Sequence, residues 1–263
     1  MKEGGNMANQ DGTQAIRRAA TMLQRIAHVA GDEPPTLRNL SQAVDLPRST
    51  AHRILKALTD TGLAYYDPQT RRYEIGMLSY ELGLAVTDNV LQLAPWAAAV
   101  DRVAQRANVT TYLMRRSGME AVCVHKAEGR TVIRVIPVEV GQRRYLGVGA
   151  GATALLAGLP DETVDRIIAA VTPDLEAFAD LTPDRVREAV AEARRTGFSE
   201  SQGRAYRSIY GLGVGVNAHA AEPDIAISIA AHAPEVDETR IAEWKTIIAE
   251  EIAETRKRLA VRR

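Results

Sequence analysis

Apolar side chains recur every three or four positions between residues 14 and 30, with arginines and glutamines between them. This spacing predicts an amphipathic helix, and the two prolines within residues 31–35 end it because proline has no backbone N–H to donate. Thr36 is a candidate N-cap for a shorter helix over residues 37–44. Residues 1–13 are polar and contain glycine, so they are predicted to form a flexible tail.

A third helix is predicted over residues 47–61, with Gly62 as the residue that ends it. One face is apolar and the other is basic or carries hydroxyl groups, with Arg48, Ser49, His52, Arg53 and Lys56. Asp45 suits the tight turn that joins this helix to the one before it. The pattern of residues 36–61 therefore predicts a helix-turn-helix. Such a helix fits a major groove about 12 Å wide and presents donors to base edges. The alternative is a solvated basic face on an ordinary helical bundle.

The residues that follow predict a β-hairpin. Two short runs rich in tyrosine, 63–66 and 72–75, are separated by the turn residues 67–71. Three helices followed directly by a hairpin give the order of a winged helix, which weakens the helical-bundle alternative. Arg71 and Arg72 at the tip of the hairpin would reach the DNA backbone or the minor groove.

Two runs in this region resemble the IclR family of transcriptional regulators. Residues 46–55, LPRSTAHRIL, resemble the family's recognition helix, and residues 67–76, DPQTRRYEIG, resemble its wing. Asp45 departs from the family, which usually has glycine there. The resemblance implies that Arg48, Ser49, Thr50, His52 and Arg53 contact bases and phosphates, and that Lys56, Arg71 and Arg72 add phosphate or wing contacts.

The chain is predicted to form two domains. Residues 14–76 make the winged helix-turn-helix, residues 77–89 an apolar linker helix, and residues 90–263 an α+β domain. A core helix of a single domain is the alternative for residues 77–89. In the resembling family this helix supports dimerisation, so we expect a homodimer, and the family commonly pairs dimers. A two-fold dimer also matches a pseudo-palindromic operator.

The C-terminal two thirds alternate between helical and strand-like patterns. Helices are predicted near 91–106, 160–170, 183–196 and 238–259, and strands near 109–115, 121–125, 131–136, 212–216 and 225–231. The fold class is therefore two-domain α/β (α+β), and the resemblance makes the C-terminal part a GAF-like effector-binding domain.

Residues 147–154, GVGAGATA, run into a predicted helix and raise the question of a phosphate-binding loop. A P-loop needs a lysine where Thr153 stands, and no acidic residue ends a strand about 20 residues later, as a dinucleotide site would require. Small residues at a helix N-terminus instead leave free N–H groups for an anionic group of a ligand.

Residues 141–157 resemble the effector-domain stretch of the family and depart from it at Tyr145, Gly147, Ala152 and Thr153. Segments 197–201, 208–216 and 226–231 resemble further parts of that domain. Carried over by position, the resemblance implies a pocket wall that includes Ala150, Gly151, Ser201, Ile209, Gly211, Ser228 and Ala230.

Two polar positions of that pocket are altered here. Gly211 stands where many relatives have cysteine, and Ala230 replaces a serine, so we expect a larger pocket and an effector bulkier or less polar than a two-carbon acid. If the hydroxyl of Ser228 is buried, it needs a hydrogen-bond partner. The sequence does not decide between a backbone group and a ligand as that partner. Arg143 and Arg144 either attract a carboxylate or form a solvated edge.

Composition adds limits to this interpretation. The chain has 263 residues, of which 46% are hydrophobic, and its 33 basic and 33 acidic side chains cancel. Net charge therefore provides no general attraction to DNA, but residues 14–76 carry nine basic and six acidic groups, a local excess of three. No apolar run is long enough to span a membrane, the N-terminus does not resemble a secretory signal, and Cys123 is the only cysteine. These features favour the cytoplasm.

No pattern indicates catalysis. The five histidines are scattered, and Cys123 and His125, as alternate residues of one strand, are expected to share a face without an orienting group. We expect no metal, no cofactor and no enzyme. The interpretation is a transcriptional regulator, a repressor rather than an activator, controlled by a small organic acid or aromatic metabolite. The alternatives are an enzyme with an accessory winged helix and a winged helix that binds protein.

Overall fold

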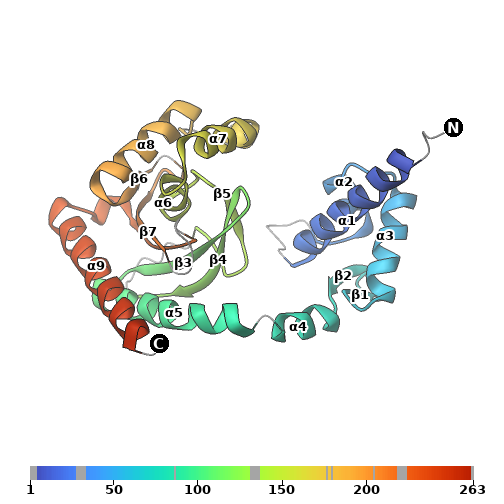
Figure 1. Ribbon diagram of the computed structural model, residues 1–263, viewed down its shortest axis with the longest axis horizontal. Helices are drawn as coiled ribbons and strands as arrows, with labels where there is room; N and C mark the ends of the chain where they lie inside the picture. The colour runs from blue at the N-terminus through green and yellow to red at the C-terminus, as the bar shows by residue number, and fades with distance from the viewer. Residues whose placement is uncertain are drawn as a thin grey trace. The chain divides into compact units, whose positions relative to one another are not determined.

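The computed structural model describes the backbone of residues 5–27, 34–85, 87–130, 137–175, 177–178, 180–203, 205–217 and 224–261. The chain divides into two compact units, Met1–Asn89 and Val90–Arg263 (Figure 1). The strand predicted over residues 131–136, together with His28 and His219, lies outside the described residues. No described helix is long and apolar enough to cross a membrane.

The N-terminal unit consists of helices packed on a two-stranded hairpin. Its elements are α1 (Gly5–Ala27), α2 (Leu37–Ala43), α3 (Arg48–Asp60), β1 (Ala64–Asp67), β2 (Arg72–Ile75) and α4 (Met77–Leu84). One small core joins all of these elements except α4 and is formed by Met22, Ile26, Leu40, Ala51, Leu55, Leu58, Ala64 and Tyr73. Apolar positions from the three predicted helices and from the hairpin pack together in this core, although Ile16 of α1 is exposed and Met22 is buried instead.

Helix α1 begins at Gly5, whereas a flexible tail was predicted over residues 1–13. Residues 5–13 contain no proline, and extending an existing helix adds one hydrogen bond for each residue that becomes ordered. The polar sequence of residues 5–13 therefore did not prevent them from extending α1 toward the N-terminus. The linker region differs as well, because α4 ends at Leu84 and a separate helix begins at Thr87.

Short polar side chains shape the turns of this unit. The Thr36 hydroxyl accepts the Asn39 N–H and caps α2, as predicted. Asp45 has a φ of 49°, which explains why glycine is usual at this position in the family that the sequence resembles. In the hairpin turn the Asp67 carboxylate accepts the backbone N–H of Gln69 and the hydroxyl of Thr70, and these hydrogen bonds lower its pKa.

The C-terminal unit is a six-stranded antiparallel sheet with helices on both faces. Its order is β5-β4-β3-β8-β7-β6. The strands are β3 (Thr110–Ser117), β4 (Glu120–Ala127), β5 (Arg143–Tyr145), β6 (Ser199–Gln202), β7 (Ile209–Val216) and β8 (Ile225–His232). The helices are α5 (Thr87–Ala107), α6 (Ala150–Ala157), α7 (Asp161–Leu175), α8 (Pro183–Thr196), the short η1 (Ala233–Glu235) and α9 (Glu238–Val261).

Two cores follow from this layering. Helices α6, α7 and α8 cover one face of the sheet, and α5 and α9 cover the other (Figure 1). Trp96 of α5 and Trp244 of α9 are both buried in the second core. Strands β5 and β6 were not predicted, because each has only three or four residues and lies at an edge of the sheet.

A β-bulge corrects the expectation that Cys123 and His125 share a face. Leu113 and Met114 of β3 pair with His125 and Cys123 respectively, so Val124 is an extra residue in the ladder. Cys123 packs in the core beneath α6, whereas His125 Nε2 lies 2.8 Å from Asp101 Oδ1 of α5, on the opposite face.

A buried carboxylate connects α5 to α9. The side chain of Glu251, in a residue 6% exposed, accepts hydrogen bonds from Arg102 Nε at 2.6 Å and Arg106 at 2.9 Å. Burial raises the pKa of Glu251, but the two arginines outweigh this effect, so its pKa is lowered overall. The neighbouring Glu250 also pairs with Arg106, at the surface.

We expect Glu251→Gln to reduce the free energy of unfolding of this unit by about 1.5–3 kcal/mol at pH 7, because a charged acceptor is lost. A lowered folded-state pKa stabilises the fold above the unfolded pKa, and the gain disappears as pH falls through the folded value. The difference in the free energy of unfolding between the wild type and Glu251→Gln should therefore disappear when the pH falls below the ordinary range of glutamate pKa values.

Guanidinium unfolding followed by tryptophan fluorescence measures this difference, since Trp96 and Trp244, the chain's two tryptophans, lie in the core beside the cluster. The matched control is Glu250→Gln, which removes an exposed partner of the same Arg106 and is expected to cost less than about 1 kcal/mol. Equal losses of stability in the two variants, or a loss in Glu251→Gln that does not depend on pH, would contradict the stabilising role of the ionised Glu251 carboxylate.

Candidate functional site

Helix α3 has one buried face and one polar face. Ala51, Leu55 and Leu58 pack into the small core, which leaves the opposite side of the helix to solvent. Five of the side chains predicted to contact DNA from that side are exposed, namely Arg48, Ser49, His52, Arg53 and Lys56. Thr50 is half-buried. The structure therefore brings them together on one surface of one helix.

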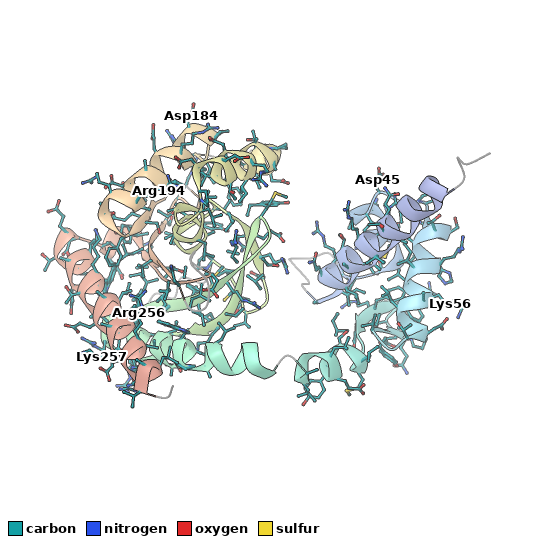
Figure 2. All side chains as sticks on the ribbon, in the orientation of Figure 1. Asp45, Lys56, Asp184, Arg194, Arg256 and Lys257 are labelled. Carbon is teal, nitrogen blue, oxygen red and sulfur yellow. The ribbon has the colours of Figure 1, made fainter. Side chains whose placement is uncertain are left out.

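Most of the positive charge on this surface is not neutralised within the protein. Lys56 Nζ lies 2.7 Å from Asp60 Oδ2, one turn further along, and both side chains are more than half exposed. Figure 2 shows Lys56 on the outer side of α3. Such a pair contributes little and can be exchanged for a phosphate. Arg48 and Arg53 form no ion pair among the described residues.

The hairpin places two more basic side chains in the same unit. Arg71 and Arg72 are exposed at its tip, and Arg72 pairs with Asp67 in the strand ladder. Arg71 has a φ of 56°, a left-handed conformation that few non-glycine residues adopt. Because α3 packs against β1, the helix and the wing belong to a single compact body.

A cavity of about 60 Å³ lies between the start of α6 and strands β3, β6, β7 and β8. This exceeds the ~10–15 Å³ that one water molecule needs. All seven residues of the predicted pocket wall line it: Ala150, Gly151, Ser201, Ile209, Gly211, Ser228 and Ala230. Residues up to 80 positions apart in the sequence therefore meet around one space.

The start of α6 opens onto this cavity. Gly149 is the N-cap with a φ of 81°, and no side chain caps the helix. The Thr153 hydroxyl donates to the carbonyl of Gly149 at 2.9 Å and to that of Gly147 at 3.2 Å, which secures the glycine-rich turn. The first N–H groups of α6 have no intrahelical partner, and they carry the positive end of the helix dipole.

The expected enlargement of the pocket at Gly211 is wrong. A Cβ on Gly211 would lie 3.1 Å from the Cβ of Ala150 and 3.4 Å from that of Ser201. At Gly213 it would lie 2.8 Å from the Ala150 carbonyl. The glycines of β7 let α6 approach the sheet closely, so the missing side chain is replaced by helix and not by empty space.

Ser228 has a free hydroxyl in a buried position. The residue is 6% exposed, lines the cavity, and has no hydrogen-bond partner among the described residues. A Cβ on Gly151 would lie 2.7 Å from Ser228 Oγ, so this hydroxyl faces the start of α6. Of the two partners left open by the sequence, the structure supplies no backbone group, which leaves the hydroxyl available to a ligand.

The predicted pocket wall omitted ten further residues around the cavity, of which only Arg144 had been considered separately, as a residue that attracts a carboxylate. They are Tyr112, Met114, Pro137, Val138, Arg144, Val148, Gly149, Ala152, Tyr206 and Ile229. Most are apolar or small and have no sequence signal that separates a cavity wall from a core. Burial raises the pKa of Tyr112, so its phenol stays protonated.

The structure also separates two arginines that the sequence treated together. Arg143 Nη1 lies 2.7 Å from Glu120 Oε2 and does not line the cavity, whereas Arg144 does. Both are half-buried, so neither belongs to the solvated edge that was one of the two expectations.

The residues considered for catalysis do not form a reactive group. Burial raises the pKa of the Cys123 thiol to about 12, and its Sγ donates to the carbonyl of His125. A protonated thiol is a poor nucleophile at neutral pH. Among the residues that the structure describes, no group of three or more His, Cys, Asp or Glu is placed to hold a metal ion.

Comparisons with known proteins agree in both units. Residues 15–68 match the IclR helix-turn-helix domain, and residues 87–255 match the family described as bacterial transcriptional regulator IclR C-terminal. The chain is 29% identical over 197 residues to the HTH-type transcriptional repressor AllR of Klebsiella pneumoniae, an alignment that covers 73% of this chain and 70% of that protein. It is 29% identical over 159 residues to AllR of Escherichia coli K12, covering 60% and 58%.

Solved structures show the same fold. An IclR transcriptional regulator from Alicyclobacillus acidocaldarius matches with a TM-score of 0.74 and 22% identity, covering 92% of this chain and 96% of that one. An IclR homologue from Microbacterium hydrocarbonoxydans, complexed with 4-hydroxybenzoate, matches with a TM-score of 0.71 and 18% identity, covering 92% and 99%.

Proposed function

The chain belongs to the IclR family of bacterial transcriptional regulators, and from this premise we propose that it is a repressor whose operator binding is controlled by a small organic molecule. The named relatives are repressors, not enzymes, so the alternative of an enzyme with an accessory winged helix is set aside. The observation that carries the proposal is the exposed cationic face of α3 beside an arginine-tipped wing.

DNA recognition is assigned to α3 and the hairpin. Arg48, Ser49, His52 and Arg53 would meet base edges and phosphates in the major groove, and Thr50 would contribute less because it is half-buried. Lys56, Arg71 and Arg72 would bind phosphates or the minor groove, again by analogy with the family pattern. A winged helix that binds only protein would not need unpaired arginines on this face.

The cavity of the C-terminal unit is the proposed effector site. It combines apolar walls with a few converging donors, the arrangement typical of small-molecule sites. Its small volume and the filled space beside Gly211 favour a compact ligand. The free Ser228 hydroxyl and the open N-terminus of α6 favour an acceptor or an anionic group on that ligand. This supports a small organic acid, with or without an aromatic ring.

A homodimer is proposed from the surface of α4. Not one residue of this helix is buried, and Met77, Tyr80, Leu82 and Leu84 are exposed apolar side chains, at 68% and 63% for the first two. Such a surface on a short helix is covered most simply by a second copy. Two copies would present two recognition helices to the half-sites of a pseudo-palindromic operator, and pairs of dimers would bind two such sites.

Control then requires that the effector prefer one arrangement of the paired DNA-binding units. A ligand shifts such an equilibrium only through its differential affinity for the two arrangements. The same coupling works in reverse, so operator DNA should change effector affinity by the same factor.

Fluorescence anisotropy on the DNA upstream of the protein's own coding region tests the proposal, with a scrambled duplex as control. We expect binding that is selective for the operator and that weakens as the salt concentration rises. Two chains should bind each operator of two half-sites, and one member of a set of small acids should change the affinity for this DNA. Equal binding to both duplexes would contradict a specific operator. An affinity unaffected by the acids would contradict effector control by this class.

A further inference from the structure

Arg143 and Arg144 are adjacent in sequence but point to opposite faces of the sheet. Both lie on β5, where successive side chains alternate in direction, and β5 pairs with β4 so that Ala121 is opposite Arg144 and Val122 opposite Arg143. Arg143 is neutralised by Glu120 at 2.7 Å. Arg144 points the other way and lines the effector cavity.

The guanidinium of Arg144 is bound only by neutral groups. Its Nε donates to Tyr206 Oη at 2.9 Å, Nη1 to the carbonyl of Arg143 at 2.7 Å, and Nη2 to the carbonyl of Pro137 at 2.6 Å. A fourth, longer hydrogen bond runs from Nη2 to the amide oxygen of Gln142 at 3.5 Å. Within the described ranges no carboxylate lies near enough to form an ion pair with it.

A half-buried arginine without an acidic partner is uncommon, since burying a charge without a counter-charge costs free energy. Arginine has five N–H donors, and the three short hydrogen bonds together with the longer one to Gln142 hold the guanidinium plane while leaving one donor on Nη1. The group is therefore positioned and still able to bind an anion.

Tyr206 is placed to take part in the same contact. Because its oxygen accepts the N–H of Arg144, its own hydroxyl proton remains to be donated. Its ring contacts that of Phe178 edge to face, with centroids 6.0 Å apart, and it also lines the cavity. An oriented phenol beside an oriented guanidinium provides two donors to one carboxylate.

We infer that Arg144, oriented by Pro137 and assisted by Tyr206, is the specificity-determining residue that selects effectors bearing a carboxylate. The inference rests on the proposed function, since it names the group that the effector cavity recognises. Met114 and Val138 place apolar side chains in the same cavity, and partial burial strengthens a charge-assisted hydrogen bond. The ligand would supply the missing counter-charge.

A purely structural role for Arg144 makes a different prediction. If Arg144 only stabilised the conformation of residues 137–145 by donating to their carbonyl groups, its loss would weaken the binding of charged and uncharged ligands alike. If it recognises the carboxylate, only the charged ligands should be affected. The comparison of an acid with its own amide separates these roles, because the two have nearly the same shape.

The experiment is calorimetric titration of the full chain, without DNA, with pyruvate, succinate, benzoate and 4-hydroxybenzoate, and with the amide of each. We expect at least one acid to bind the wild-type protein and its amide to bind at least tenfold more weakly. Arg144→Gln should weaken that acid about ten- to a hundredfold and leave its amide within about threefold. Arg144→Lys, which keeps the charge, should retain part of the preference.

The matched control is Arg143→Gln, which removes the adjacent arginine that Glu120 neutralises, and it should keep the acid affinity within about threefold. Thermal melting of each variant establishes that it is folded. Equal losses for acid and amide in Arg144→Gln, an unchanged acid affinity in a folded variant, or no acid binding to the wild type up to ~10 mM would each overturn the inference. These titrations contain no DNA, so operator binding by the same samples would still succeed or fail independently.

Discussion

Replacing Arg53 by alanine is expected to weaken operator binding about five- to a hundredfold, the equivalent of about 1–3 kcal/mol for an arginine that reads a base. Arg53 is exposed near the middle of α3, opposite the buried Leu55 and Leu58, and it has no ion pair among the described residues. Its guanidinium is thus available without first breaking a contact in the protein. Anisotropy with the operator and with the scrambled duplex measures the loss.

Two controls separate base reading from general charge. Arg25→Ala removes an exposed arginine from the last turn of α1, which is not among the predicted DNA contacts, and should change operator affinity less than threefold. Lys56→Ala should weaken the operator and the scrambled duplex alike and reduce the salt slope by about one, as expected for a phosphate contact. If Arg53→Ala bound the operator as the wild type does, the DNA-binding assignment of α3 would be wrong and a protein partner would be favoured.

Gly76→Ala is expected to destabilise the N-terminal unit by about 3 kcal/mol or more, above the usual cost of overpacking. A Cβ on Gly76 would lie 2.1 Å from the carbonyl oxygen of Gly62 and 2.9 Å from the backbone nitrogen of Ala64. Backbone atoms cannot rotate away as a side chain can. The position is also held by hydrogen bonds, since Gly76 donates to the Leu63 carbonyl at 2.9 Å.

This glycine is needed for close approach and not for an unusual dihedral angle, because its φ is −83°. It connects the wing to α4, so its displacement should disturb both the hairpin and the proposed dimer surface. Hydrogen exchange of peptides that cover residues 64–84 is expected to lose protection in Gly76→Ala, and operator binding should fall with it.

Gly83→Ala is the matched control on the same helix. A Cβ there meets nothing within 4 Å, and alanine favours a helix over glycine by about 0.8–1.0 kcal/mol. This variant should keep or slightly raise protection. Wild-type protection in Gly76→Ala, or equal losses in the two variants, would contradict the account of the junction.

Seven of the residues that line the cavity were predicted by position-by-position resemblance to the family and not by their spacing in the sequence. The sequence has no pattern that unites Gly151, Ser201 and Ser228, which come from α6, β6 and β8. It also led to one wrong expectation, a larger pocket at Gly211. The close approach of Ala150 depends on how tightly α6 packs on β7, and composition does not determine that distance.

The sequence by itself determined the DNA-binding unit. Its helices and hairpin follow from helical periodicity, a capping threonine, two prolines and a turn, all within residues 14–76. The side chains on the exposed face of α3 lie on a single helix, so the 3.6-residue repeat alone places Arg48, His52 and Lys56 on one side. Local rules were sufficient because every contributing residue is close in sequence.

Only the tertiary structure decided the contents of the cavity. Its walls come from six secondary-structure elements, five strands and helix α6, and strand pairing brings the strands together. Which of two adjacent arginines faces the cavity depends on how β5 pairs with β4, and a shift of one residue would exchange them. In the same way one bulge in β4 separates Cys123 from His125. Strand register depends on contacts between segments distant in sequence, so the order of residues along one strand does not reveal it.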